Sequence, residues 1–430
     1  MTLNLRAQTS VANSALPPAE NSAADPVPVS RVSQLYAVSS TGGRMVPMEG
    51  MRGLAVLLVF FVHFDALFGA YVRGIPLLWT PTHFLGIVGN AGVDLFFVLS
   101  GYLIYGGLIR RKPESVRFLR RRLQRIYPTF LVVFGCYLAL SVLFPEAGRL
   151  RGRTPAGTLL YILENILLLP GVFPIVPIIT VAWSLSYEIF SYLGMLVLVV
   201  GARLWTWQAR TRVLFFTCLW FIYLSLSLTM RRSLVRALMF VVGILLFEAL
   251  ENERFRRQLT RRREFLSLAL FGLTLAFAYL LDRRPDLFAL LPGWAAGWNL
   301  APGVMVYHGP YKTLAFSISM FWLTAHACAY HQGMLSRVFS WLPLRWLGNM
   351  SYSYYLVHGV TLQAVALFLT SVVPPAGTDA ILFLAALPAA FCTTWITATA
   401  LFAAVEKPFS LRSAQAPALR ADASAPFRNS

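Results

Sequence analysis

Arg52 and His63 lie eleven residues apart in the first apolar stretch of the chain. Eleven helical residues turn through about 1100°, so both side chains share one helix face, about 16 Å apart along its axis. Arginine can bind phosphate through paired hydrogen bonds, and a neutral imidazole can take a proton from a hydroxyl. The spacing therefore predicts phosphate binding at one end and proton transfer deeper inside. A core histidine, with Arg52 reaching toward lipid headgroups, would have the same spacing.

Two carboxylates in apolar surroundings are further candidates for chemistry. Asp94 is expected at the outer start of a second helix, where it either complements the helix N-terminus or orients His63 from a neighbouring helix. Glu188 is expected one to two turns inside another helix, where it needs Arg236 or His63 as a partner. Either carboxylate would hold the productive tautomer of His63. Ionisable groups inside a spanning segment cost roughly 2.5–3.5 kcal/mol each, so each is a functional candidate.

A basic run, RRLQRIYP, could bind a polyanionic donor such as coenzyme A through Arg121, Arg122 and Arg125. It could equally be a cytoplasmic loop that only sets the topology. Further residues are expected to bind substrate or to support the site: Trp183, Ser184, Tyr187, His358 and Glu406. The spacing of histidines and cysteines predicts no metal site.

The composition requires a membrane around the helices that hold these residues. Of 430 residues, 57% are hydrophobic and only 13% are charged, with a mean hydropathy of +0.63. A soluble domain of this length needs more charge on its surface. The net charge of +19 does not indicate nucleic acid, because the basic residues stand in short runs between apolar segments.

The apolar pattern predicts an all-α, polytopic transmembrane bundle of about ten helices between residues 45 and 410. Residues 1–44 and 411–430 are expected to be disordered tails, and 156–181 an interfacial or re-entrant segment. The expected spans are about 53–72, 91–109, 126–144, 183–202, 213–230, 234–250, 265–281, 313–330, 350–371 and 380–403. Most Lys and Arg would then lie on the side of the termini, which predicts cytoplasmic termini. The Ala- and Arg-rich composition suggests a bacterial inner membrane.

Six motifs in order make the chain resemble the acyltransferase 3 family of polytopic membrane acyltransferases over roughly residues 46–410. The first helix carries Arg52, Gly53 and His63 at the family's spacing. Glu49 stands where the family usually has Asp, and Ile189 where it often has a second Glu. The other five motifs are GVDLFFVLSGYLI, RRLQRIYP, WSLSYE, SYSYYLVH and EKP.

This resemblance implies acetyl-CoA or a related acyl-CoA as the donor on the cytoplasmic side. It implies a sugar hydroxyl of a lipopolysaccharide, exopolysaccharide or glycolipid as a common acceptor. His63 would act either as general base or as a transient acyl carrier. A glycolipid or polysaccharide transporter or flippase is the alternative from another class, because buried Arg, His and Glu could relay protons. An acyltransferase that uses another donor, such as succinyl-CoA, is the other alternative.

Overall fold

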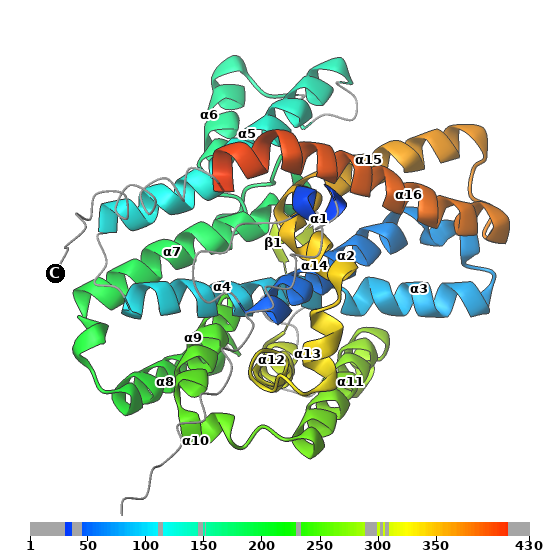
Figure 1. Cartoon of the computed structure of the whole chain (residues 1–430). Coiled ribbons are helices and arrows are strands. Elements are labelled where there is room, and N and C mark those ends of the chain that lie inside the picture. The colour runs from blue at the N-terminus through cyan, green and yellow to red at the C-terminus, as the bar shows by residue number, and fades with distance from the viewer. Residues whose placement is uncertain are drawn as a thin grey trace, which may run out of the picture. The chain divides into compact units, whose positions relative to one another are not determined.

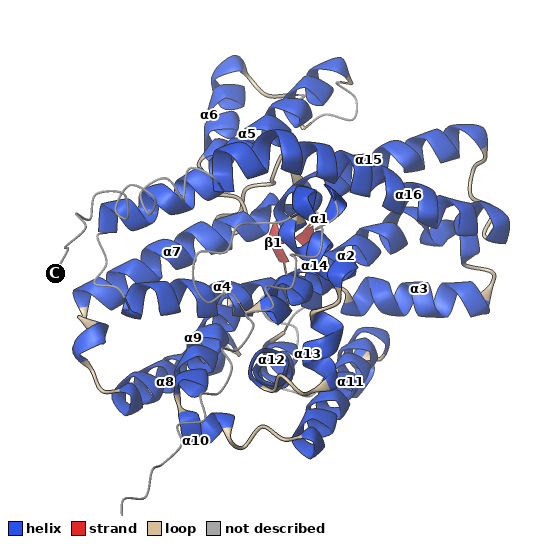
Figure 2. Cartoon of the chain, in the orientation of Figure 1, coloured by secondary structure: helices blue, strands red, loops and turns tan. Residues whose placement is uncertain are grey.

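Long helices dominate the computed structural model of the protein (Figures 1 and 2). It describes residues 31–36, 45–110, 115–144, 149–150, 152–228, 234–288, 299–301, 304–305 and 309–411. The chain divides into two units, Met1–Leu35 and Tyr36–Ser430, and the long helices belong to the second. Apart from one short two-stranded ribbon, the regular structure of the second unit within the described ranges is helical, so the predicted all-α class is confirmed.

Each of the ten predicted spans corresponds to a helix. These helices are α2 (Val46–Phe68), α4 (Ala91–Arg110), α5 (Ser115–Leu143), α7 (Trp183–Gly201), α8 (Ala209–Ser227), α9 (Leu238–Glu251), α11 (Arg261–Arg283), α12 (Pro310–Ala329), α15 (Ser351–Val372) and α16 (Ala380–Leu401). Among the described residues, eight helical stretches are long and apolar enough to cross a membrane, and α9 and α12 are not among them. The predicted number of about ten is therefore approximate.

Shorter elements connect these helices. They are the helices α1 (Arg31–Tyr36), α3 (Pro76–Val88), α6 (Pro155–Ile166), α10 (Glu253–Arg256), α13 (Met334–Phe339) and α14 (Leu342–Asn349), the helical turns η1 (Gly69–Val72), η2 (Thr180–Ala182), η3 (Leu204–Thr206), η4 (Val235–Ala237) and η5 (Pro285–Phe288), the π-helix η6 (Phe402–Leu411), and the strands β1 (Asn299–Ala301) and β2 (Val304–Met305). The β1–β2 ribbon is antiparallel.

The second predicted span, 91–109, matches α4, but the helix before it, α3, was not among the predicted spans. Helices α3 and α4 form one apolar stretch of 35 residues, Pro76–Arg110, interrupted only at Gly89 and Asn90. Pro76 stands in the first turn of α3, where its missing N–H costs nothing. Asp94 lies in the first turn of α4, so its predicted place at the start of a helix is confirmed, although α3 continues the apolar stretch before it.

Glycines bring α4 close to its two neighbours. A Cβ at Gly92 would collide with the backbone oxygen of Ala55 in α2, and one at Gly101 with that of Phe240 in α9. Gly243 of α9 lies equally close to the backbone of α4. Gly92, Gly101 and Gly243 thus permit close helix packing. This packing places the polar residues of α2, α4 and α9 next to one another.

Replacing Gly101 with valine should therefore disrupt the fold. The new side chain would meet backbone atoms of α9, which cannot move aside as a flexible side chain can, so the cost should exceed the usual 1–3 kcal/mol of overpacking. Gly107→Val is the matched control, because Gly107 lies on the same helix with nothing within 4 Å of its added Cβ. Detergent-solubilised Gly101→Val should unfold at a clearly lower temperature than Gly107→Val. Equal midpoints would contradict this account of the α4–α9 contact.

Two predicted irregular regions have partly regular structure. Within 156–181, α6 has 12 residues, about 18 Å of helix, which is too short to cross a bilayer. The interfacial or re-entrant placement of this segment stays a prediction. Residues 31–36 differ from the expected tail, because they form α1 and the Tyr36 ring stacks on Trp346. The remaining residues of the two expected tails lie outside the described residues, except Leu411, which ends η6.

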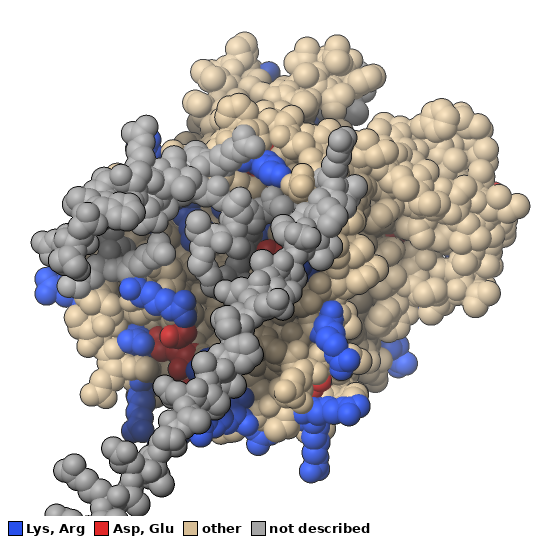
Figure 3. All heavy atoms as spheres, viewed as in Figure 1, with Lys and Arg blue, Asp and Glu red and all other residues tan. Residues whose placement is uncertain are grey.

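Charge is unevenly distributed over the face shown in Figure 3. The surface over α15 and α16 is almost wholly uncharged there, whereas Lys and Arg gather toward α10 and α11. This second region holds exposed arginines at positions Arg254, Arg256, Arg257, Arg261, Arg262 and Arg263. An apolar surface beside a basic one is typical of a protein that crosses a membrane.

Candidate active site

The centre of the candidate site is a pair of histidines from α2 and α15. The Nδ1 atom of His63 lies 3.3 Å from Nε2 of His358, and the two rings meet edge to face with centroids 4.7 Å apart. His358 is completely buried and His63 partly so. The two residues are 295 positions apart in the chain, and the packing of α15 on α2 brings them together.

Backbone carbonyls decide which nitrogens carry protons in this pair. Nδ1 of His358 lies 2.6 Å from the Tyr355 carbonyl oxygen, which can only accept, so Nδ1 is the protonated nitrogen of neutral His358. Its Nε2 can then only accept, and Nδ1–H of His63 donates to it and to the Val59 carbonyl oxygen at 3.0 Å. Nε2 of neutral His63 is left without a proton, as a general base or nucleophile requires.

Tyr355 links this pair to the start of α7. Its hydroxyl lies 2.8 Å from Oγ of Ser184 and donates to the Val181 carbonyl oxygen at 3.0 Å. Its ring lies 5.7 Å from that of His358. Ser184, predicted to bind substrate or support the site, is therefore one residue removed from the histidine pair.

Asp94 pairs with Arg236 of η4. The Nε atom of Arg236 donates to Oδ1 of Asp94 at 2.8 Å, and Nη2 donates to the Asn90 carbonyl oxygen at 2.8 Å, at the break between α3 and α4. The guanidinium lies over the ring of Trp183, 5.0 Å from its centroid. Both charged residues are buried, with relative exposures of 1% and 2%.

This pairing corrects two predictions. The ring that hydrogen-bonds His63 is that of His358, and neither Asp94 nor Glu188 takes this place. Arg236 is the partner of Asp94 and not of Glu188. Glu188 instead accepts a short hydrogen bond from the Tyr192 hydroxyl in its own helix. Sequence reasoning required a partner for each buried carboxylate but could not tell which helices would be neighbours.

Glu406 brings two of the predicted phosphate-binding arginines together. It is buried in η6, where its Oε2 accepts hydrogen bonds from the backbone N–H of Ser353 at 3.1 Å and from its hydroxyl at 2.6 Å. Arg52 of α2 and Arg125 of α5 both interact electrostatically with this carboxylate. Residues from three distant parts of the sequence thus form one charged cluster.

A second arginine of α5 reaches Glu188. The Arg122 guanidinium lies over the ring of Tyr192, 5.4 Å from its centroid, and interacts electrostatically with Glu188. Arg121, on the same helix, is exposed. Of the three predicted donor-binding residues in α5, Arg122 and Arg125 thus interact with the carboxylates Glu188 and Glu406.

A model of the acyltransferase 3 family, described as an acyltransferase domain, matches residues 47–399. The chain belongs to this family. It is therefore a membrane-bound acyltransferase, and the matched region contains His63, His358 and the Asp94–Arg236 pair. Glu406 lies outside the match, in η6.

Curated relatives are similar over different lengths. The exopolysaccharide production protein ExoZ of Rhizobium meliloti is 32% identical over 119 residues, 26% of this chain and 34% of that protein. The acyltransferase MdmB of Streptomyces mycarofaciens is 26% identical over 347 residues, 74% of this chain and 79% of that protein. The peptidoglycan O-acetyltransferase OatA of Listeria monocytogenes is 26% identical over 349 residues, 72% of this chain and 48% of that protein. The matches thus span about a third of ExoZ and half of OatA. No solved structure matches the chain.

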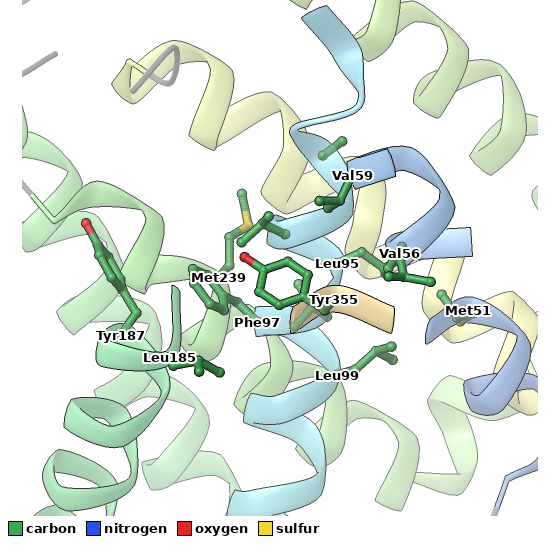
Figure 4. Close-up of a cluster of buried hydrophobic side chains, with 14 of the residues drawn as sticks. Met51, Val56, Val59, Leu95, Phe97, Leu99, Leu185, Tyr187, Met239 and Tyr355 are labelled. Carbon is green, nitrogen blue, oxygen red and sulfur yellow. The ribbon is translucent and has the colours of Figure 1, made fainter. Parts of the chain in front are cut away.

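The helix face between Arg52 and His63 is closely packed in this acyltransferase. Val56 and Val59 share that face and are buried against Leu95 and Tyr355 in the apolar cluster of Figure 4. Tyr187, another predicted site residue, stacks on Phe97 at the edge of the same cluster. A ligand that extends from Arg52 to His63 must therefore displace or pass these side chains.

Tyr355 was not among the predicted site residues of the acyltransferase, and Arg236 was named only as a partner for Glu188. Arg236 is the only charge between Leu234 and Phe247 of a strongly apolar run, which is a signal for a functional residue. Tyr355 stands in a tyrosine-rich stretch, SYSYYLVH, where nothing distinguishes it from Tyr352 and Tyr354. Only the packing of α15 on η2 and α7 selects its hydroxyl for the site.

Proposed function

We propose that this acyltransferase moves an acyl group, first of all acetyl, from acyl-CoA to a hydroxyl of a cell-envelope carbohydrate or glycolipid. The observation that carries this proposal is the His63–His358 contact, whose geometry leaves Nε2 of His63 unprotonated. Arg52, on the same helix face, would bind the donor while the imidazole acts on the acceptor.

The donor end of the site is the arginine cluster around Glu406. CoA carries several phosphate charges, and Arg52 and Arg125 supply two guanidinium groups from different helices. Glu406 would keep the two cations together in the absence of donor. Its hydrogen bonds from Ser353 would hold the carboxylate in place when the phosphates bind.

The chemical step requires one base. The acceptor hydroxyl would lose its proton to Nε2 of His63 as its oxygen attacks the carbonyl carbon of the thioester. Nδ1–H of the resulting imidazolium would still donate to Nε2 of His358. The carbon–sulfur bond then breaks, the ester forms, and His63 returns its proton to the CoA thiolate. Transient acylation of His63 itself is the alternative, and mass spectrometry of rapidly quenched enzyme would detect it.

The names of relatives support a carbohydrate acceptor. One curated relative is named for exopolysaccharide production and another as a peptidoglycan O-acetyltransferase. We infer an acceptor of the same chemical class here, at the cell envelope of a bacterium. The loop charges favour cytoplasmic termini in the inner membrane, with the donor entering from the cytoplasm.

Release of CoA from acetyl-CoA tests this function directly. The purified protein, in detergent or nanodiscs, is incubated with acetyl-CoA with and without a cell-envelope glycan extract. We expect glycan-dependent CoA release and a glycan whose mass rises by one acetyl group. Transfer only from succinyl-CoA would identify another donor, and the product mass would show it. Binding of glycan without release from any acyl-CoA would overturn the proposal.

Loss of the cationic pair should weaken donor binding more than turnover. Arg52→Gln with Arg125→Gln should raise KM for acetyl-CoA by about 10²-fold or more, because each of the two charge-assisted hydrogen bonds contributes roughly 1.5–3 kcal/mol. Arg120→Gln is the control, since Arg120 lies on α5 but is exposed. The measurement is KM for acetyl-CoA and for dephospho-CoA thioesters. An equal KM in the double variant and the control would contradict a donor site at Glu406.

A further inference from the structure

Arg236 and Arg212 each form an ion pair with a buried carboxylate, but they differ in how many guanidinium nitrogens have a hydrogen-bond acceptor. Arg212 donates through Nε and Nη2 to Glu248 and through Nη1 to the Trp207 carbonyl oxygen, so all three nitrogens have acceptors. Arg236 donates through Nε to Asp94 and through Nη2 to Asn90. Within the described residues, its Nη1 has no acceptor, although its side chain is only 3% exposed.

The Arg236 guanidinium is held from several sides, and Nη1 is left for a ligand. Asp94 and Asn90 hold two edges of the Arg236 guanidinium in place, and Trp183 covers one face. Its third nitrogen is thus fixed in position before any ligand arrives. A preorganised donor in an apolar site is what stabilises negative charge developing on oxygen.

The position of Arg236 connects it to the histidine pair. Trp183, beneath its guanidinium, precedes Ser184, whose hydroxyl bonds that of Tyr355. Tyr355 in turn contacts the ring of His358 and interacts electrostatically with Arg236. His358, which hydrogen-bonds the base His63, and the buried cation Arg236 therefore both interact with Tyr355. On the face of α2, Val56 and Val59 stand between Arg52 and His63 and pack into the same cluster as Tyr355.

We propose that Arg236 binds the carbonyl oxygen of the acyl thioester and stabilises the oxyanion formed during transfer. The proposal rests on the function proposed above. When the acceptor oxygen bonds to the carbonyl carbon, the π electron pair moves onto the carbonyl oxygen, and Nη1–H of Arg236 donates to it. Collapse restores the carbonyl, breaks the carbon–sulfur bond and releases CoA thiolate, which takes the proton held by His63. Asp94 is a positioning residue: by accepting from Nε, it fixes the orientation of the Arg236 guanidinium toward the carbonyl oxygen.

Two CoA analogues test this assignment without an acceptor. S-acetonyl-CoA has a ketone next to its sulfur-bound carbon, and S-propyl-CoA lacks the carbonyl. Wild type and Arg212→Lys should bind the ketone about tenfold more tightly, whereas Arg236→Lys should bind both within about twofold. Its kcat with acetyl-CoA should also fall by about 10²–10³, the usual loss for one oxyanion donor. Arg212→Lys serves as the control for loss of a fixed arginine from an ion pair.

A second variant covers the case in which Arg236→Lys does not fold. Asp94→Asn with Arg236→Gln removes both charges together, so no unpaired charge stays buried. It too should lose the preference for the ketone. Retained preference in either folded Arg236 variant, equal loss in Arg212→Lys, or no preference in wild type would overturn the role of Arg236. Failure of the wild type to bind either analogue would instead overturn the CoA donor itself.

Discussion

Replacing His63 with glutamine should reduce acyl transfer by about 10²–10⁴-fold, the contribution expected of a positioned general base. Glutamine can still donate to the Val59 carbonyl oxygen that Nδ1 of His63 contacts, so the helix should keep its local hydrogen bond. It cannot take a proton from a hydroxyl near neutral pH. The measurement is glycan-dependent CoA release by the purified variant, together with its yield in the membrane fraction.

His326 provides a matched control for this substitution. Its Nδ1 contacts the carbonyl oxygen of Trp322, four residues earlier, at 2.9 Å, just as Nδ1 of His63 contacts Val59 at 3.0 Å. It is buried in α12, where its Nδ1 also lies 3.0 Å from Oγ of Ser267. We expect His326→Gln to keep kcat within about threefold of the wild type. Full activity in His63→Gln, or equal losses in both variants, would remove His63 from the chemistry.

The helices of this protein could be predicted because each one must be apolar over its own length. A bilayer requires about 20 apolar residues per span, and that requirement is local in sequence. The prediction left out α3, which has only 13 residues. In α3, Pro76 opens the helix and Gly86 gives room for Asp65 of α2, so neither residue ends the apolar stretch. Asp94, predicted at a helix start, lies in the first turn of the next helix, α4.

The spacing of residues within one helix predicts part of the site, but it does not predict the partners that come from other helices. One helix face holds both Arg52 and His63, and helical periodicity alone gives that result. The neighbours of these residues come from other helices: His358 is 295 positions from His63, and Arg236 is 142 from Asp94. Such pairs depend on which helices pack together, and that depends on glycine contacts such as Gly101 against Phe240. Residue types indicated that partners must exist, but only the packing identifies them.

Replacing His358 should reduce activity through its effect on His63. Its Nδ1–H is committed to the Tyr355 carbonyl oxygen, so its Nε2 can only accept from His63. His358→Ala removes this acceptor and leaves only the Val59 carbonyl to hold the His63 ring, so kcat should fall by about 10- to 100-fold, the usual loss for an orienting partner. The measurement is kcat for CoA release at saturating acetyl-CoA.

A double variant separates orientation from an independent contribution. If His358 acts only by positioning His63, adding His358→Ala to His63→Gln should cost no further activity, because the group it orients is already absent. His358→Gln should recover part of the lost activity, since an amide oxygen can accept from Nδ1–H of His63 while the amide nitrogen donates to Tyr355. KM for acetyl-CoA should stay near the wild-type value in these variants, because the arginines around Glu406 are untouched. Losses that multiply in the double variant would mean that each histidine contributes separately, as two proton carriers would, and not as one base held by its neighbour.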